Sequence, residues 1–85
     1  MIFDKGEIRS IGLKVKSKNG SQFIINTAEY VISLGDDVVE RGQCGIEGND
    51  LIILFHADEK GRYKVTFKYT IADETLIDEI IVEVI

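Results

Sequence analysis

Cys44 and His56 are the only cysteine and the only histidine of this 85-residue sequence, and they are its best candidates for nucleophilic or acid–base chemistry. A thiol nucleophile needs a histidine base beside it and a carboxylate that orients the base. His56 directly follows an apolar run, where a histidine usually bonds to backbone or water, and Cys44 lies in an irregular segment, where a free cysteine usually packs as a small hydrophobe. We therefore predict no catalytic residue and no enzymatic activity.

Acidic residues gather at the turns of the chain. Alternating strand directions would bring Asp36 and Asp37 to the same end of the molecule as Asp58 and Glu59, and Ca²⁺ takes about six to eight oxygen ligands. The Asp-x-Asp-x-Asp-Gly spacing of a calcium loop is absent, and acidic residues commonly form turns and keep a domain soluble. We predict no metal and no cofactor, and we keep a calcium-dependent module that binds carbohydrate or a surface as the alternative function. The opposite end is expected to hold Asp50, Asp73 and Glu74.

Length and composition predict one globular domain over residues 1–85. Hydrophobic residues make up 45% of the chain and charged residues 29%, which is outside the range of disordered chains. Proline is absent, and the eight glycines fall mostly between apolar runs rich in β-branched residues. This composition favours strands joined by tight turns, so we expect an all-β fold.

The charge pattern disfavours nucleic acid and anionic membranes as partners. The formal net charge is −5, and the ten basic residues are scattered along the chain, whereas phosphate-binding surfaces need clustered Lys and Arg. The densest basic segment holds Lys14, Lys16 and Lys18, and the polar face of a strand explains it.

A single cysteine excludes an internal disulfide. The first residues, Met1 to Lys5, lack the basic and then apolar run of a secretory signal, and no apolar stretch reaches the length of a membrane span. We expect the protein to be made in the cytoplasm and either kept there or carried out of the cell as part of a larger assembly.

The clearest strand pattern runs from Gly61 to Ile71. Apolar and aromatic residues alternate with Lys and Thr throughout this segment, which is typical of a strand with one buried face. The spacing Glu59-x-Gly61-x-Tyr63 is similar to a tyrosine corner, in which a tyrosine at the start of a strand bonds back to the upstream backbone. We therefore expect Tyr63 and Tyr69 to face the core, with the hydroxyl of Tyr63 bonded to backbone.

The remaining chain gives a series of short strands. Lys18-Asn19-Gly20-Ser21 carries an Asn-Gly pair, which predicts a hairpin between the strands on either side. Leu51 to Phe55 is a continuous apolar run, which predicts a strand buried on both faces. With turn signals roughly 8 to 12 residues apart, about six or seven strands and a sandwich are expected. The other expected segments are a lead-in or short edge strand over 1–7, strands over 7–17 and 76–85, a long strand over 22–34 bulged near Asn26-Thr27, and a bulged or edge strand over 38–47.

The last strand carries an unusual amount of apolar surface. Val82 and Val84 alternate with Ile81 and Glu83, so both of its faces are partly apolar. If the face with Ile77, Ile81 and Ile85 is exposed, a partner is expected to cover it by strand addition.

Three framework segments carry a family resemblance. They are an apolar strand over Ala28–Ser33, a valine-rich segment ending in glycines over Val38–Gly48, and a Gly-x-Tyr strand followed by an acidic turn over Gly61–Thr75. Together they resemble the small immunoglobulin-like proteins and domains of tailed phages and prophages of Gram-positive bacteria, across residues 21–85. The chain lacks the core tryptophan and paired cysteines of antibody domains.

The resemblance implies an immunoglobulin-like antiparallel β-sandwich. It also implies a non-catalytic structural or protein-interaction role in a phage tail or baseplate, and it carries over no functional residue. The partners we expect are other proteins, either virion or tail components or further copies that associate through strand edges.

Overall fold

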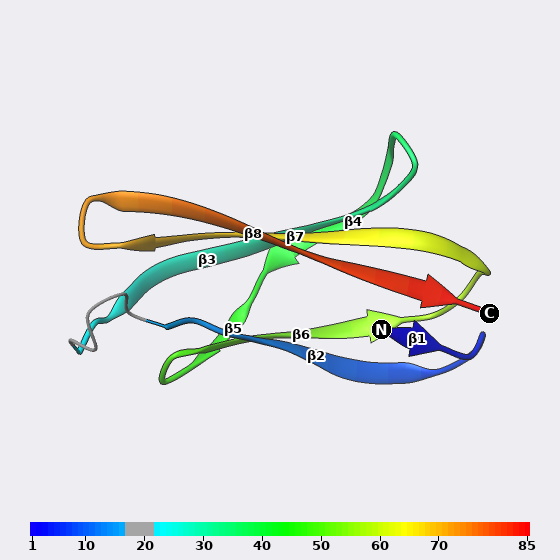
Figure 1. Ribbon diagram of the computed structural model, residues 1–85, viewed down its shortest axis with the longest axis horizontal. Coiled ribbons are helices and arrows are strands. Elements are labelled where there is room, and N and C mark those ends of the chain that lie inside the picture. The colour runs from blue at the N-terminus through cyan, green and yellow to red at the C-terminus, as the bar shows by residue number, and fades with distance from the viewer. Residues whose placement is uncertain (17–21) are drawn as a thin grey trace.

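The computed structural model describes residues 1–16 and 22–85, and these form an all-β structure of two sheets packed face to face (Figure 1). The larger sheet has the strand order β1-β8-β7-β3-β4, and the smaller has the order β2-β6-β5. The strands are β1 Ile2–Phe3, β2 Ile8–Lys14, β3 Ile25–Leu34, β4 Asp37–Gln43, β5 Gly45–Glu47, β6 Asp50–His56, β7 Gly61–Ile71 and β8 Glu74–Val84.

Strand β7 forms the middle of the larger sheet, as its alternating sequence predicts. The side chains of Tyr63, Val65, Phe67 and Tyr69 are buried between the sheets, while Lys64 and Lys68 are exposed on the outer face. β7 pairs with β3 on one side and with β8 on the other, both antiparallel. Burying one face of this strand is what holds the larger sheet against the smaller one.

Phe55 of β6 joins the two sheets through aromatic contacts. Its ring meets Phe3 edge to face at a centroid distance of 5.4 Å and Tyr63 in the same way at 5.6 Å. Such edge-to-face pairs stabilise beyond the burial of their area, by roughly 0.5–1.5 kcal/mol each. The short strand β1 is therefore fixed by packing as well as by pairing.

Strand β6 is buried on one face only, so the prediction that it is buried on both is wrong. Leu51, Ile53 and Phe55 face the larger sheet, but Ile52 is half-buried and Leu54 is 52% exposed. No third layer covers the outer face of the small sheet within the described residues. The continuous apolar run therefore places hydrophobic side chains in solvent.

The predicted hairpin between the first two long strands is also wrong. Its turn residues lie outside the described part of the chain, but the flanking strands belong to different sheets, since β2 pairs with β6 while β3 pairs with β4 and β7. β2 instead pairs along its whole length with the apolar strand β6, and no described strand pairs with its other edge.

The segment predicted as one strand over 38–47 is two strands in different sheets. β4 ends at Gln43, the chain crosses at Cys44, and β5 begins at Gly45 in the small sheet. The Cys44 amide donates to the Ala28 carbonyl at 3.0 Å across this crossing. Both strands lie at sheet edges, as expected. The pairing of β4 with β3 also shifts register between Ile32 and Ser33.

Two further differences concern the strand count and direction. The described residues form eight strands rather than six or seven, because β1 is added and the 38–47 segment is divided. β1 pairs with β8 in parallel, with Ile2 opposite Glu83 and Phe3 opposite Val84, so the larger sheet is not wholly antiparallel. The bulge predicted near Asn26-Thr27 is confirmed by a register shift between Ile25 and Thr27.

Candidate functional site

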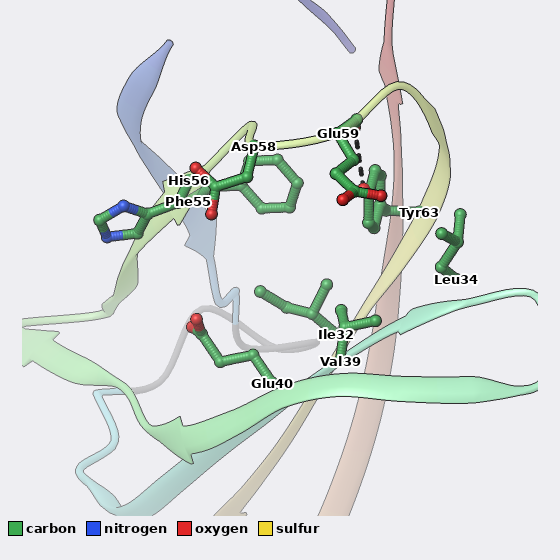
Figure 2. Close-up of a pocket in the computed structure, with 9 residues that line it drawn as sticks. All are labelled: Ile32, Leu34, Val39, Glu40, Phe55, His56, Asp58, Glu59 and Tyr63. Carbon is green, nitrogen blue, oxygen red and sulfur yellow. Dashed lines mark hydrogen bonds between the residues drawn. The ribbon is translucent and has the colours of Figure 1, made fainter. Parts of the chain in front are cut away.

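A hollow lies at the end of the sandwich where β4 and the loop before β7 diverge (Figure 2). Its volume is about 370 Å³. The two sheets supply its apolar walls from Ile32 and Leu34 on β3 and from Phe55 on β6. The hollow is a gap at the rim of the core. It is also lined by Val39, Glu40, His56, Asp58, Glu59 and Tyr63.

Tyr63 closes one side of this hollow. Its hydroxyl donates a hydrogen bond of 2.8 Å to the backbone carbonyl oxygen of Glu59, as the spacing predicts. Burial of the side chain raises the pKa of Tyr63, and the nearby charges of Glu59 and Asp58 act in the same direction. The hydroxyl is thus a neutral donor that holds the loop before β7 in place.

The turns place the acidic residues at the two ends of the molecule, in the two groups that were predicted. Figure 1 shows the turn after β3 and the loop before β7 at one end, and the turns before β6 and before β8 at the other. Asp58 and Glu59 line the hollow together with Glu40, whereas Asp36 and Asp37 do not. No group of three or more His, Cys, Asp or Glu residues in the described part of the chain is placed to hold a metal ion.

Cys44 and His56 lie on different parts of the fold. Cys44 is half-buried at the crossing between β4 and β5, and burial, followed by the charge of Glu29, raises the pKa of its thiol to about 11. His56 is exposed at the end of β6. A thiol with so high a pKa carries little thiolate at neutral pH and is a weak nucleophile.

The other two tyrosines donate to carboxylates. The Tyr30 hydroxyl lies 2.6 Å from Glu40 Oε2, and this bond and then burial raise the pKa of Tyr30 to about 12. The Tyr69 hydroxyl lies 2.6 Å from Asp78 Oδ2, and burial followed by this bond raises the pKa of Tyr69 to about 12. All three tyrosines therefore act as framework donors at the rim of the core.

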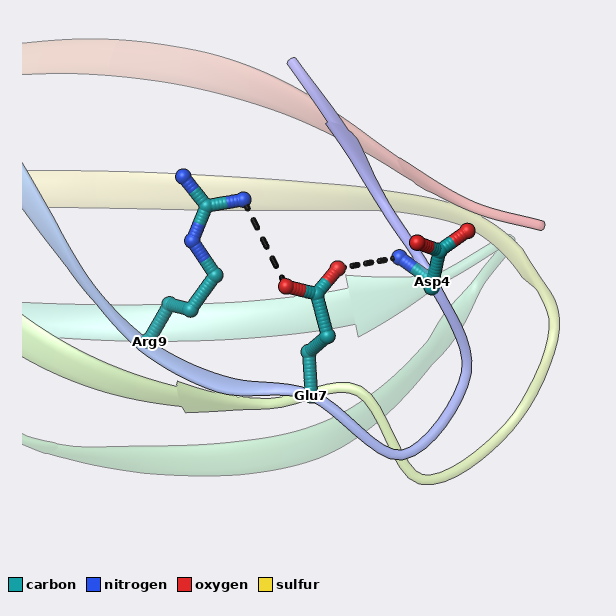
Figure 3. Close-up of polar contacts among 3 residues, drawn as sticks. All are labelled: Asp4, Glu7 and Arg9. Atoms are coloured by element: carbon teal, nitrogen blue, oxygen red, sulfur yellow. Dashed lines mark hydrogen bonds and ion pairs between the residues drawn. The ribbon is translucent and has the colours of Figure 1, made fainter.

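Arg9 on β2 is held by contacts within the chain (Figure 3). Arg9 Nη1 lies 3.7 Å from Glu7 Oε2, and the guanidinium carbon of Arg9 lies 4.6 Å above the centre of the Phe3 ring. The other oxygen of Glu7 accepts a hydrogen bond of 2.6 Å from the Asp4 amide. These contacts tie β1 to the start of β2.

Open strand edges are the remaining candidate surface. The sequence analysis did not predict one of them, the edge of β2. Among the described strands β2 pairs only with β6, and the N-terminal segment covers the last strand only from Ile81 to Ile85. The other open edges among the described strands belong to β1, β4 and β5. The sequence predicts apolar surface on the last strand, and Ile77 is indeed 61% exposed. The edge of β2 was missed because the Asn-Gly signal assigned that strand a partner.

Comparison of the chain with protein-family models, with curated proteins and with solved structures found no significant match. No helix in the described residues is long and apolar enough to cross a membrane.

Proposed function

We propose that this chain is an immunoglobulin-like, non-catalytic protein-interaction module that binds partner proteins at its open strand edges, and that it serves as an accessory protein of a phage or prophage tail or baseplate. Two observations support this role: the three tyrosine hydroxyls bond within the chain, and several strand edges in the described residues are open.

Strand order supports the immunoglobulin-like assignment. In that fold one sheet contains strands B, E and D, and the other contains C, F and G, with C′ added beside C in variable-type domains. Here β2-β6-β5 corresponds to B-E-D, and β8-β7-β3-β4 corresponds to G-F-C-C′. The bond from Tyr63 at the start of β7 to Glu59 corresponds to the tyrosine corner at the start of strand F.

The observation that carries the interaction role is the open edge of β8. From Glu74 to Ile80 this strand pairs with β7 on one side, while the N-terminal segment reaches it only from Ile81, whose carbonyl oxygen accepts from the Met1 amine at 3.5 Å. An uncovered strand presents unpaired backbone donors and acceptors, which is the template used when an extended segment adds to a sheet. Ile77 and Ile81 place apolar side chains beside that edge, and an added strand would cover part of them.

Mass spectrometry of purified particles tests the virion role. Prophage induction in the source strain, followed by density-gradient purification, should recover this chain together with tail proteins. A host cytoplasmic protein of similar abundance serves as the control for carry-over. Absence of the chain from particles that contain the tail proteins would overturn the virion role.

A further inference from the structure

The hollow beside Tyr63 combines apolar walls with a rim of one charge sign (Figure 2). Ile32 and Phe55 at its base are buried, while Val39 on its wall is 52% exposed and open to solvent. Among the described residues that line it there is no lysine and no arginine. Its carboxylates belong to Glu40, Asp58 and Glu59.

Glu40 occupies a position of β4 that faces the interior of the sandwich. It lies directly opposite Ile32, which is 4% exposed, and residues opposite each other in an antiparallel pair share a face. The Tyr30 hydroxyl donates to Glu40 Oε2 at 2.6 Å and holds the side chain there. Figure 2 shows the Glu40 carboxylate directed toward the gap between β4 and the loop before β7.

Asp58 and Glu59 bring two more carboxylates to the hollow from that loop. The bond from the Tyr63 hydroxyl to the Glu59 carbonyl oxygen fixes the loop, and after burial the charges of Glu59 and Asp58 contribute to the raised pKa of Tyr63. Neither carboxylate forms an ion pair within the described residues, and Lys60 beside them does not line the hollow. The ion pairs found there join Arg9 to Glu7 and Lys64 to Glu79.

The combination of apolar wall and acidic rim selects the occupant. An anion would be repelled by the three carboxylates, and no group of His, Cys, Asp or Glu in the described chain is placed to hold a metal ion. A wholly apolar group would desolvate the carboxylates without pairing them. Lysine and arginine side chains carry an apolar stem and a cationic head, and they bury the stem while the head stays at the polar rim.

Size favours a single side chain over a larger ligand. The hollow has a volume of about 370 Å³, which is near the lower end of the roughly 300–1,000 Å³ found for small-molecule pockets. It is also open on the solvent side, as Figure 2 shows, so a side chain presented by another protein can enter it. The net charge of −5 favours a partner with a basic surface.

We propose that the hollow receives an arginine side chain of a partner protein. The stem of the arginine packs against Ile32 and Val39, and its guanidinium pairs with the carboxylates at the rim. This inference rests on the proposed interaction role, to which it adds a contact separate from the open strand edges.

Arginine suits this rim better than lysine does. Its planar guanidinium has five N–H donors and can pair with carboxylates on two sides at once, here Glu40 from β4 and Asp58 or Glu59 from the loop. The guanidinium is also more weakly hydrated than an ammonium group, so it loses less on entering an apolar hollow. Lysine is therefore expected to bind in the same place and more weakly.

Titration with a blocked arginine, N-acetyl-arginine amide, tests the inference by NMR. The methyl signals of Ile32, Leu34 and Val39 should shift in a saturable way, with a Kd on the order of 1 mM for so small a ligand. The methyl signals of Ile77, on the outer face of the larger sheet, should not move. Blocked citrulline has the shape of arginine without its charge, and it should give no saturable shift over the same concentrations.

Two double variants separate the hollow from the general negative charge of the molecule. Asp58→Asn with Glu59→Gln removes two charges from the rim, and Asp73→Asn with Glu74→Gln removes the same two types of charge from the opposite end. The first variant should raise the Kd for blocked arginine about threefold to tenfold, and the second should leave it unchanged. All four side chains belong to exposed residues, so both variants should keep the fold, which circular dichroism checks.

Four results would overturn the inference. They are no saturable shift with blocked arginine, equal binding of blocked citrulline, equal weakening by the two double variants, and tighter binding of free arginine than of the blocked form. The last would indicate a site for the free amino acid, although its own carboxylate should be repelled by the acidic rim.

The outcome is independent of the test for the virion role. A chain that binds blocked arginine in the hollow but is absent from purified particles would keep this inference and lose the virion role. A chain that is present in particles but does not bind blocked arginine would do the reverse.

Discussion

The Tyr63 hydroxyl donates a 2.8 Å hydrogen bond to the carbonyl oxygen of Glu59, and this bond fixes the loop that enters the central strand β7. Tyr63→Phe keeps the ring packed against Phe55 but leaves the carbonyl without this donor. We expect a loss of about 1–2 kcal/mol in the free energy of unfolding. Urea denaturation measures it, and an unchanged midpoint would contradict the role given to this bond.

Gly61 begins β7 at a φ of +150°, a conformation that side chains rarely adopt. An added Cβ would lie 2.9 Å from Leu34 Cδ1. Gly61→Ala should therefore destabilise the fold by about 1–3 kcal/mol. Gly45→Ala is the matched control, because its Cβ would meet only the Ile52 carbonyl oxygen at 3.5 Å and Ile52 Cβ at 4.0 Å. Equal thermal midpoints for the two variants would show that Gly61 is not constrained as described.

The two faces of the larger sheet should respond differently to truncation. Phe67 is fully buried between the sheets, so Phe67→Ala should cost about 3–5 kcal/mol. Ile77 on the adjacent strand is 61% exposed on the outer face, so Ile77→Ala should change stability by about 0.5 kcal/mol or less. Denaturant unfolding of dilute protein measures both, and a large loss for Ile77→Ala would mean that this face is covered.

Stability should fall at high pH because tyrosines are held protonated. Burial and the bond to Asp78 raise the pKa of Tyr69 from 10.0 to about 12, and the pKa of Tyr30 rises to about 12 through its bond to Glu40 and its burial. A raised folded-state pKa means that this stabilisation is fully present below pH 10 and is lost as the pH rises toward 12. Unfolding free energies measured across this range should fall, and less steeply in Tyr69→Phe. A flat profile would contradict the assignment.

Cys44 should react slowly with alkylating reagents. Burial, followed by the charge of Glu29, raises the pKa of its thiol from 9.0 to about 11, and the thiolate is the reactive form. At pH 8 iodoacetamide should modify the folded protein roughly a hundredfold more slowly than the chain in urea, because two pKa units change the thiolate fraction by that factor. Equal rates would show that the thiol is exposed and unperturbed.

Local patterns predicted the elements of this fold better than their pairing. The alternation from Tyr63 to Tyr69 identified the buried face of β7, and the spacing before Tyr63 identified its bond to backbone. Both features depend on a few neighbouring residues, so the local sequence is enough to predict them. The bulge near Asn26-Thr27 could be predicted for the same reason.

Which sheet a strand joins depends on contacts between residues that are distant in the sequence, and these contacts were predicted wrongly. The Asn19-Gly20 pair favours a hairpin, yet β2 pairs with β6, whose residues lie some forty positions later. Leu54 looked like core because nothing in the run Leu51–Phe55 distinguishes its two faces. The hollow beside Glu40 was missed for a similar reason, since its lining comes from two stretches that are distant in the sequence, 32–40 and 55–63.

Amide hydrogen exchange, followed residue by residue by NMR, tests most directly the claim that the open backbone edges of β2 and β8 make the contacts. In dilute protein the amides of Ser10, Gly12, Ile77 and Glu79 should exchange fast, whereas those of Ile11 and Ile80, which point into their sheets, should be protected. On binding to particles, the four edge amides should gain protection together. Protection that appears instead on β4 or the loops, or edge amides that stay fast in the bound state, would contradict the account.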